Sequence, residues 1–307
     1  MASTSSGSES LGSGARDNTA QMKLIRFGEP GQESPGLQLS DGRRIDASGF
    51  GEDYGEAFFA SRGPARLSDW ASEPGRLGSA PSIPADTRLG SPVMRPSKIV
   101  CIGLNFSDHA AETGATLPEE PIIFFKSTTA LCGPDDPLII PRTSKHTDWE
   151  VELAFVVGKR ASYVDEGEAL EHIAGYALMN DYSERSFQKE RGGQWSKGKS
   201  ADSFAPLGPF LATPDEMGDI DDLRMWLKVN GEIRQDGNTA NLIFKVPFLL
   251  SYLSQFMTLL PGDIISTGTP AGVGAGMVPP QFIRPGDRIE LGIDGLGSSS
   301  QLAVACR

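Results

Sequence analysis

Two glutamates, Glu150 and Glu152, alternate with apolar residues in the segment 148–157, which reads DWEVELAFVV. This alternation of β-branched and aromatic residues predicts a β-strand. Alternate residues of a strand face the same way, so the two carboxylates should project together with their Cα atoms about 6.6 Å apart. Repulsion and desolvation penalise such a pair, and a divalent cation would relieve both penalties. The alternative is a solvated edge strand with an acidic outer face.

A third carboxylate follows a second predicted strand, at residues 173–180. Asp181 stands directly after that strand, in the sequence DYSERSFQ. Three carboxylates and a few water molecules make a site suited to Mg²⁺ or Ca²⁺, because these cations prefer oxygen ligands. The alternative role of Asp181 is to cap the helix that follows.

Arg185 and Gln188 lie about one helical turn beyond Asp181, so they should share one side of the turn that follows the strand. A guanidinium offers a fork of donors that matches a carboxylate. Arg185 is therefore a candidate for binding the carboxylate of a substrate. Its alternative role is a surface salt bridge.

His109 and Glu112 lie in the sequence LNFSDHAAE, in which Ser107 or Asp108 is a predicted helix cap. Residues three apart share one face of a helix. A glutamate beside a histidine orients the imidazole and raises its basicity, which suits a general base for water. The alternative is a surface helix whose histidine and glutamate are both solvated.

Two further segments carry groups for an anionic substrate. The stretch 191–209 is glycine-rich and basic without the spacing of a P-loop. Lys199 or Lys197 within it either stabilises an enolate or is an ordinary solvated lysine. Residues 267–270 read TGTP before a glycine-rich loop. Their backbone N–H groups and hydroxyls are suited to bind a carboxylate, and a tight turn is the alternative.

Composition limits the class of protein. The 307 residues are 38% hydrophobic and include 36 glycines and 22 prolines, which favours a loop-rich, strand-rich globular protein. A formal net charge of −12 argues against nucleic acid as a partner. Three widely spaced cysteines predict neither a disulfide framework nor a zinc site, and they fit a cytoplasmic location. No apolar run approaches the ~20 residues that span a membrane.

Three regions are predicted along the chain. Residues 1–21 are rich in serine and glycine, which predicts a disordered extension or an appended tail. Residues 22–95 are predicted to form a small N-terminal domain, and residues 96–307 the catalytic domain. Within the catalytic domain, the glycine- and proline-containing loop 113–121 is a candidate lid. A helix is expected at residues 166–172.

Several motifs together resemble the fumarylacetoacetate hydrolase family. They keep the order of the family over about residues 98–300 and read GLNFSDHAAE (103–112), DWEVELAFVV (148–157), NDYSERSFQ (180–188), GKSADSFAPLGP (198–209), VNGEIRQDGNT (229–239) and PGDIISTGTPAGVG (261–274). The segment that begins at residue 22 is similar to the small domain of the longer family members.

The resemblance implies a fold that is mainly β with some α, a mixed β-sandwich roll plus a small N-terminal domain, in a chain that forms a homodimer. It implies Mg²⁺, with Mn²⁺ or Ca²⁺ as alternatives, held by Glu150, Glu152 and Asp181. It also implies that His109 and Glu112 activate a water molecule on a helix that becomes ordered with the lid.

The resemblance assigns the α-keto acid end of a substrate to Arg185, Gln188, Lys199 and Thr269. The implied reaction is hydrolytic cleavage of the C3–C4 bond of a 2,4-diketo acid. Water activated by His109 attacks the C4 carbonyl, and Lys199 stabilises and protonates the pyruvate enolate that is released. The products are pyruvate and a carboxylic acid.

The motifs indicate the family more specifically than they indicate the substrate. The run RGGQWSKGKS (191–200) and the long N-terminal region are most similar to bacterial hydrolases of 2,4-diketo-3-deoxy-L-fuconate and L-rhamnonate. Acylpyruvate hydrolysis, oxaloacetate decarboxylation or tautomerisation, and non-catalytic binding of an α-keto acid are the alternatives.

Overall fold

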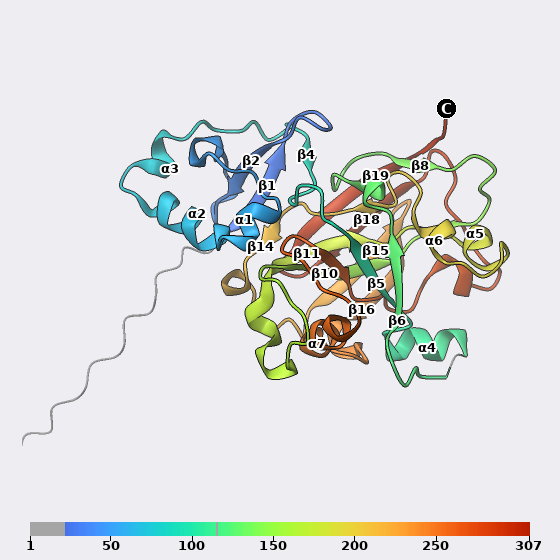
Figure 1. Cartoon of the computed structure of the whole chain (residues 1–307). Coiled ribbons are helices and arrows are strands. Elements are labelled where there is room, and N and C mark those ends of the chain that lie inside the picture. The colour runs from blue at the N-terminus through green and yellow to red at the C-terminus, as the bar shows by residue number, and fades with distance from the viewer. Residues whose placement is uncertain (1–21, 115) are drawn as a thin grey trace, which may run out of the picture.

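The computed structural model describes residues 22–114 and 116–307, so the predicted extension at 1–21 and residue 115 of the candidate lid lie outside the described residues. A mixed ten-stranded sheet crosses the molecule (Figure 1). Its strands follow the order β3 (Arg44–Asp46), β2 (Ser34–Gln38), β1 (Lys23–Phe27), β14 (Leu211–Ala212), β11 (Ile173–Asn180), β10 (Val151–Val157), β17 (Ile264–Ser266), β5 (Ile99–Gly103) and β6 (Ile122–Lys126), and β4 (Leu89–Gly90) pairs with β1.

A five-stranded sheet packs against the middle of the large sheet, where β10 contacts two of its strands, β15 and β18. Its order is β16 (Glu232–Asn238), β15 (Arg224–Val229), β18 (Arg288–Ile293), β19 (Gly297–Ala305) and β8 (Leu138–Ile140). Two small ladders complete the strands: β12 (Ser183–Glu184) with β9 (Thr147–Asp148), and β13 (Ala205–Pro206) with β7 (Leu131–Cys132). The expected mainly β architecture with some α is confirmed.

Helices are short and lie around the sheets (Figure 1). The α-helices are α1 (Glu56–Ala60), α2 (Gly63–Ser72), α3 (Arg76–Ser79), α4 (Ser107–Thr113), α5 (Arg185–Lys189), α6 (Ser196–Lys199) and α7 (Val246–Phe256). The 3₁₀ helices are η1 (Ser48–Phe50), η2 (Thr128–Ala130), η3 (Glu166–His172), η4 (Pro214–Glu216), η5 (Thr239–Asn241) and η6 (Gly274–Gly276). Within the described part of the chain, no helix has the length and apolar character needed to cross a membrane.

Strand β10 lies at the centre of the large sheet, between β11 and β17. Every residue of Val151–Val157 is buried, because the two neighbouring strands and the five-stranded sheet cover it. The alternative of a solvated edge strand is therefore wrong. The alternation of residue types indicated the strand correctly, but it could not show that both of its faces are covered.

Two local expectations differ from the structure. The predicted helix at residues 166–172 is a 3₁₀ helix. Helix α4 begins after Phe106, and neither Ser107 nor Asp108 caps it with its side chain. Phe106 is extended and forms a bridge with Leu242, so this residue takes the capping position.

The N-terminal region is joined to the rest of the chain through the large sheet. Strand β1 pairs with β14, with Lys23 opposite Ala212. Nearby, the guanidinium of Arg88 donates to Asp136 at 2.6 Å and to Glu33 at 3.1 Å. The predicted domain boundary near residue 95 stays a prediction, but strands from both sides of it share one sheet.

Candidate active site

Three carboxylates converge where β10 begins and β11 ends. The two strands are antiparallel with Val151 opposite Asn180, which places Glu150 and Asp181 beside each other just beyond the paired residues. Carboxylate oxygens of Glu150, Glu152 and Asp181 lie within 4.8 Å of one another, and all three side chains are buried. The structure therefore brings the three predicted metal ligands into one cluster.

Cationic side chains surround two of these carboxylates. The Nζ atom of Lys199 lies 2.6 Å from Oε2 of Glu150 and 2.7 Å from Oδ2 of Asp181. Nη2 of Arg185 lies 2.7 Å from Oε1 of Glu150. Nζ of Lys126 lies 2.5 Å from Oδ1 of Asp181. Every oxygen of Glu150 and Asp181 thus accepts a hydrogen bond from a cationic side chain.

These contacts decide which groups are charged. Burial acts to raise the pKa of Glu150, but the charges of Lys199 and Arg185 outweigh it and hold that pKa well below its ordinary value. Burial acts to lower the pKa of Lys199, but Asp181 and Glu150 outweigh it and raise that pKa above its ordinary value. Glu150 is therefore ionised and Lys199 protonated near neutral pH.

Glu152 lies in a different environment. Its Oε2 accepts hydrogen bonds from the hydroxyl of Ser266 at 2.5 Å and from the N–H of Gly268 at 3.0 Å. Across residues 22–114 and 116–307, no cationic side chain hydrogen-bonds to it. Burial, together with the charges of Asp181 and Glu150, raises the pKa of Glu152 well above its ordinary value.

The cluster as a whole fits a divalent cation. Its carboxylates outnumber its cationic side chains by four to three: Asp148, Glu150, Glu152 and Asp181 against Lys126, Arg185 and Lys199. A carboxylate oxygen has two lone pairs, so an oxygen that already accepts one hydrogen bond can still be a ligand. A cation at Glu152 would remove the penalty for ionising that side chain in the interior.

His109 and Glu112 lie on helix α4, one turn apart. Nδ1 of His109 lies 3.3 Å from Oε2 of Glu112. Both carboxylate oxygens of Glu112 lie 3.1 Å from the backbone nitrogen of Gly272, which donates to them. His109 is buried and faces the same cavity as Glu150. The predicted pair is thus formed, and it is attached to the glycine-rich loop.

Asp148 connects the glycine-rich loop to Arg185. Its Oδ1 accepts from the N–H of Gly274 at 2.7 Å, and its Oδ2 accepts from the N–H of Ala275 at 3.0 Å. The same Oδ2 accepts from Nε of Arg185 at 2.7 Å. This buried carboxylate therefore fixes both the guanidinium and the loop that holds Glu112.

A cavity of about 260 Å³ opens beside the cluster. Seven of the nine predicted site residues line it, namely His109, Glu150, Glu152, Arg185, Gln188, Lys199 and Thr269. Glu112 and Asp181 stand behind this wall, in contact with His109 and Lys199. The cavity therefore presents a histidine, carboxylates and cations to one small molecule.

Gln188 and Thr269 are held by neighbours. Oε1 of Gln188 accepts from Nη1 of Arg185 at 3.2 Å. The hydroxyl of Thr269 donates to the carbonyl of Val151 at 2.9 Å and accepts from Nε2 of Gln235 at 2.8 Å. In the turn 267–270, the N–H of Gly268 donates to Glu152, and the predicted binding of a substrate carboxylate by this turn stays a prediction.

Three residues of the cluster were not predicted from the sequence: Lys126, Asp148 and Ser266. Asp148 had a signal, because it precedes Glu150 and Glu152 at the same spacing of two residues. Lys126 is the last residue of the apolar strand β6. A lysine at the end of such a strand is usually solvated, so its type gave no sign of a buried contact. Ser266 carries no local signal for its contact with Glu152.

Comparison with known proteins agrees with the geometry. The family profile described as fumarylacetoacetate (FAA) hydrolase, C-terminal, matches residues 98–302. A relative from Burkholderia multivorans, named provisionally as a hydrolase, is 48% identical over 287 residues, which span 93% of this chain and 100% of the relative.

Solved structures extend the comparison. Maleylpyruvate hydrolase from Sphingobium sp. SYK-6, in complex with manganese(II) and pyruvate, is similar with a TM-score of 0.77 and 30% identity, over 93% of this chain and 100% of that chain. The 5-carboxymethyl-2-hydroxymuconate delta-isomerase from Mycobacterium smegmatis is similar with a TM-score of 0.72 and 31% identity, over the same shares. The extent of these matches shows that this chain belongs to the fumarylacetoacetate hydrolase family.

Proposed function

We propose that the protein is a metal-dependent hydrolase that cleaves the C3–C4 bond of a 2,4-diketo acid, giving pyruvate and a carboxylic acid. The observation that carries the proposal is that one cavity is lined by His109, which pairs with Glu112, and by Glu150 and Lys199 of the charged cluster. The Sphingobium relative, a hydrolase solved with manganese(II) and pyruvate, supports it.

Glu150, Glu152 and Asp181 would hold the cation, and Mg²⁺ is the proposed metal with Mn²⁺ or Ca²⁺ as alternatives. When bound, such a cation supplies Lewis acidity toward the oxygens of an α-keto acid. Arg185 offers donors at the wall of the cavity, and Gln188 and Thr269 lie beside it. These three residues would fix the carboxylate of the substrate and so align its C4 carbonyl with His109.

His109 would take a proton from a water molecule, with Glu112 holding the imidazole in position. The resulting hydroxide adds to C4, and the electron pair of the C3–C4 bond passes to C3 as a pyruvate enolate. Lys199 is protonated and buried, so its ammonium can stabilise the enolate and then deliver a proton to C3. The other product keeps C4 as its carboxylate.

Release of pyruvate from an acylpyruvate tests this function directly. Purified protein should release pyruvate when Mg²⁺ or Mn²⁺ is added and lose that activity in a chelator. Turnover that is unchanged by the chelator would overturn the metal-dependent reaction. Absence of turnover on every diketo acid would overturn the hydrolase.

A second candidate is an oxaloacetate decarboxylase or tautomerase, which needs enolate chemistry but no hydrolytic water. Its support is the isomerase among the similar structures. His109→Ala separates the two reactions, because hydrolysis should be lost while decarboxylation or tautomerisation largely survives. The closer assignment to L-fuconate and L-rhamnonate derivatives stays a prediction, since it depends on the part of the cavity that receives the substrate tail.

A further inference from the structure

Asp148 has no part in the reaction described above, yet two parts of the site meet at its side chain. The carboxylate is fully buried, and it is not one of the described residues that line the cavity. Asp148 lies in β9, opposite Ser183 of β12. Strand β12 leads directly into helix α5, whose first residue is Arg185. This short ladder therefore brings the carboxylate to the guanidinium.

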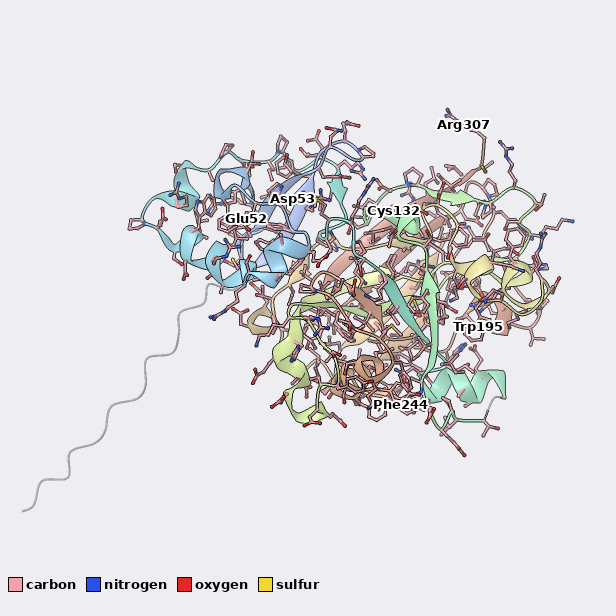
Figure 2. The ribbon with its side chains drawn as sticks, in the orientation of Figure 1. Glu52, Asp53, Cys132, Trp195, Phe244 and Arg307 are labelled. Atoms are coloured by element: carbon pink, nitrogen blue, oxygen red, sulfur yellow. The ribbon has the colours of Figure 1, made fainter. Side chains whose placement is uncertain are left out.

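The first part of the site that Asp148 holds is the group proposed to bind the substrate carboxylate. Each nitrogen of the Arg185 guanidinium has one partner: Nε donates to Asp148, Nη2 to Glu150 and Nη1 to Gln188. Within the described part of the chain, these contacts leave one N–H on Nη1 and one on Nη2 for a substrate. Figure 2 shows Trp195, which also lines the cavity, on the same side of the molecule as α5. Because Asp148 holds the Nε edge, it determines which end of the guanidinium the cavity receives.

The second part is the glycine-rich loop. Asp148 accepts from the N–H groups of Gly274 and Ala275, and the indole Nε1 of Trp149 donates to the carbonyl of Gly272 at 3.0 Å. A Cβ atom on Gly274 would lie 2.7 Å from Oδ1 of Asp148, so only glycine allows this close approach. Two consecutive residues, Asp148 and Trp149, thus fix the loop at three of its peptide groups.

The loop in turn holds the pair proposed to activate water. The N–H of Gly272 donates to Glu112, and Glu112 pairs with Nδ1 of His109. A loop released from Asp148 would present this N–H less accurately, and the imidazole would lose part of its support. One carboxylate therefore supports substrate binding through Arg185 and water activation through His109.

We propose that Asp148 is a positioning residue that lowers KM through Arg185 and raises kcat through the loop and Glu112, by two separable routes. It contacts no reacting atom and transfers no proton. This inference rests on the proposed function and adds to it a residue that makes binding and catalysis depend on the same support.

Asp148→Asn tests both routes in the Mg²⁺-loaded enzyme, with acetylpyruvate as substrate. If the amide oxygen keeps the contact with Gly274, the NH₂ group faces the N–H of Ala275 and the Nε–H of Arg185, and neither can donate to it. Loss of a charge-assisted hydrogen bond on each route should raise KM about tenfold and lower kcat about tenfold. A variant in which either constant stays at the wild-type value would overturn the proposal.

Double variants separate the two routes. In Glu112→Ala, the loop no longer has its contact with the base, so adding Asp148→Asn should leave kcat unchanged while KM still rises. In Arg185→Met, adding Asp148→Asn should leave KM unchanged while kcat still falls. Effects that add fully in both backgrounds would show that Asp148 acts on neither partner, and the proposal would be wrong.

Asp263→Asn is the matched control. Asp263 is also fully buried, and it accepts from the N–H groups of Lys98 and Leu260 and from the ammonium of Lys98. Its carbonyl accepts from the N–H of Val157, at the end of β10 that lies away from Asp148. The control should lose stability but keep both kinetic constants. If it reproduces the kinetics of Asp148→Asn, general destabilisation is responsible and the positioning role is excluded.

A spectroscopic readout is independent of turnover. The chain has 3 histidines, so the spectrum of protein labelled with ¹⁵N-histidine is simple, and His109→Ala assigns the signal of His109. Asp148→Asn should shift the His109 Nδ1 signal, whereas Asp263→Asn should not. If wild type releases pyruvate from no diketo acid, the hydrolase is overturned, while this shift still tests the support of His109. An unshifted signal in Asp148→Asn would disprove the route through the loop.

Trp149→Phe keeps the proposal testable if Asp148→Asn does not fold. The substitution removes the N–H that donates to Gly272 and leaves Asp148 and Arg185 in place. Loss of this neutral hydrogen bond should lower kcat about fivefold and leave KM unchanged. An increase in KM without a decrease in kcat would contradict the two routes.

Discussion

Glu112 accepts a hydrogen bond from the backbone N–H of Gly272, at 3.1 Å and across 160 residues of sequence. The contact attaches helix α4, which carries His109, to the glycine-rich loop. Asp148 holds the same loop through Gly274. The position of the imidazole therefore depends on a backbone loop as well as on its own helix.

This contact predicts graded effects at position 112. Glu112→Gln keeps an acceptor for Gly272 but removes the negative charge beside His109, and we expect kcat to fall about tenfold. Glu112→Ala removes both and should lower kcat about a hundredfold, within the range for general base catalysis. Single-turnover kinetics of pyruvate release measure both. Affinity for Mn²⁺ should not change, and a loss of metal binding would contradict a role through His109.

Glu152→Gln is expected to abolish binding of Mn²⁺ without destabilising the metal-free protein. The amide oxygen can still accept from Ser266 and Gly268, and the variant no longer has a buried carboxylate to ionise. In wild type, a cation at a hundred times its Kd should add about 2.7 kcal/mol to the free energy of unfolding. Thermal unfolding with and without Mn²⁺ should show this gain only in wild type.

The control for this substitution is Glu171→Gln. Glu171 pairs with Lys159 on the surface, and its side chain is 74% exposed. Binding of Mn²⁺ should raise the free energy of unfolding of Glu171→Gln by the same amount as that of wild type. Retention of that stabilisation in Glu152→Gln would exclude Glu152 as a ligand.

Lys126→Met should lower the free energy of unfolding by about 3 kcal/mol, because it leaves the buried Asp181 without one of its two cationic partners. Denaturation in urea measures this change. Lys159→Met breaks a surface pair of 3.4 Å and should change stability by only about 0.5 kcal/mol. A similar small change in Lys126→Met would mean that Lys199 alone compensates Asp181.

Stability at acid pH should depend on Glu33. Burial acts to raise the pKa of Glu33, but hydrogen bonds from the backbone and from Arg88 outweigh it and lower that pKa below its ordinary value. A carboxyl group with a lowered pKa in the folded state contributes stability above its unfolded pKa and loses it as the pH falls through the folded pKa. Wild type should therefore lose stability below about pH 4.5, the ordinary range of a glutamate.

Glu33→Gln should be less stable than wild type at pH 7, and the difference should shrink as the pH is lowered toward 3. Urea denaturation at several pH values measures it. Glu29→Gln is the control, because Glu29 is exposed and close in the same turn region. A difference between wild type and Glu33→Gln that stays constant from pH 7 to pH 3 would contradict a lowered pKa.

Much of the site was predictable because its residues lie in short motifs with regular spacing. Glu150 and Glu152 are two apart on a strand, and His109 and Glu112 are three apart on a helix, so local geometry alone places each pair on one face. The convergence of these pairs with Asp181 and Lys199 came from the resemblance to the family, since no spacing rule relates such distant residues.

The remaining parts depend on contacts between distant segments. Lys126 meets Asp181 across 55 residues, and Ser266 meets Glu152 across 114. The type of a residue does not reveal such partners. The central position of β10 could not be predicted from the sequence either. A strand that is covered on both faces and a strand that is covered on one face can have the same alternating pattern.

The pairing of β1 with β14 bears on how the protein can be divided. Excising residues 22–95 would remove β1, β2 and β3 from the large sheet. Strand β14 would then form the open edge, together with the part of β11 that the short strand β14 does not cover. Unpaired backbone groups along such a border recruit strands from other molecules. A fragment cut at the predicted domain boundary is therefore expected to self-associate. Residues 22–95 thus shield the edge of the large sheet from pairing with other molecules.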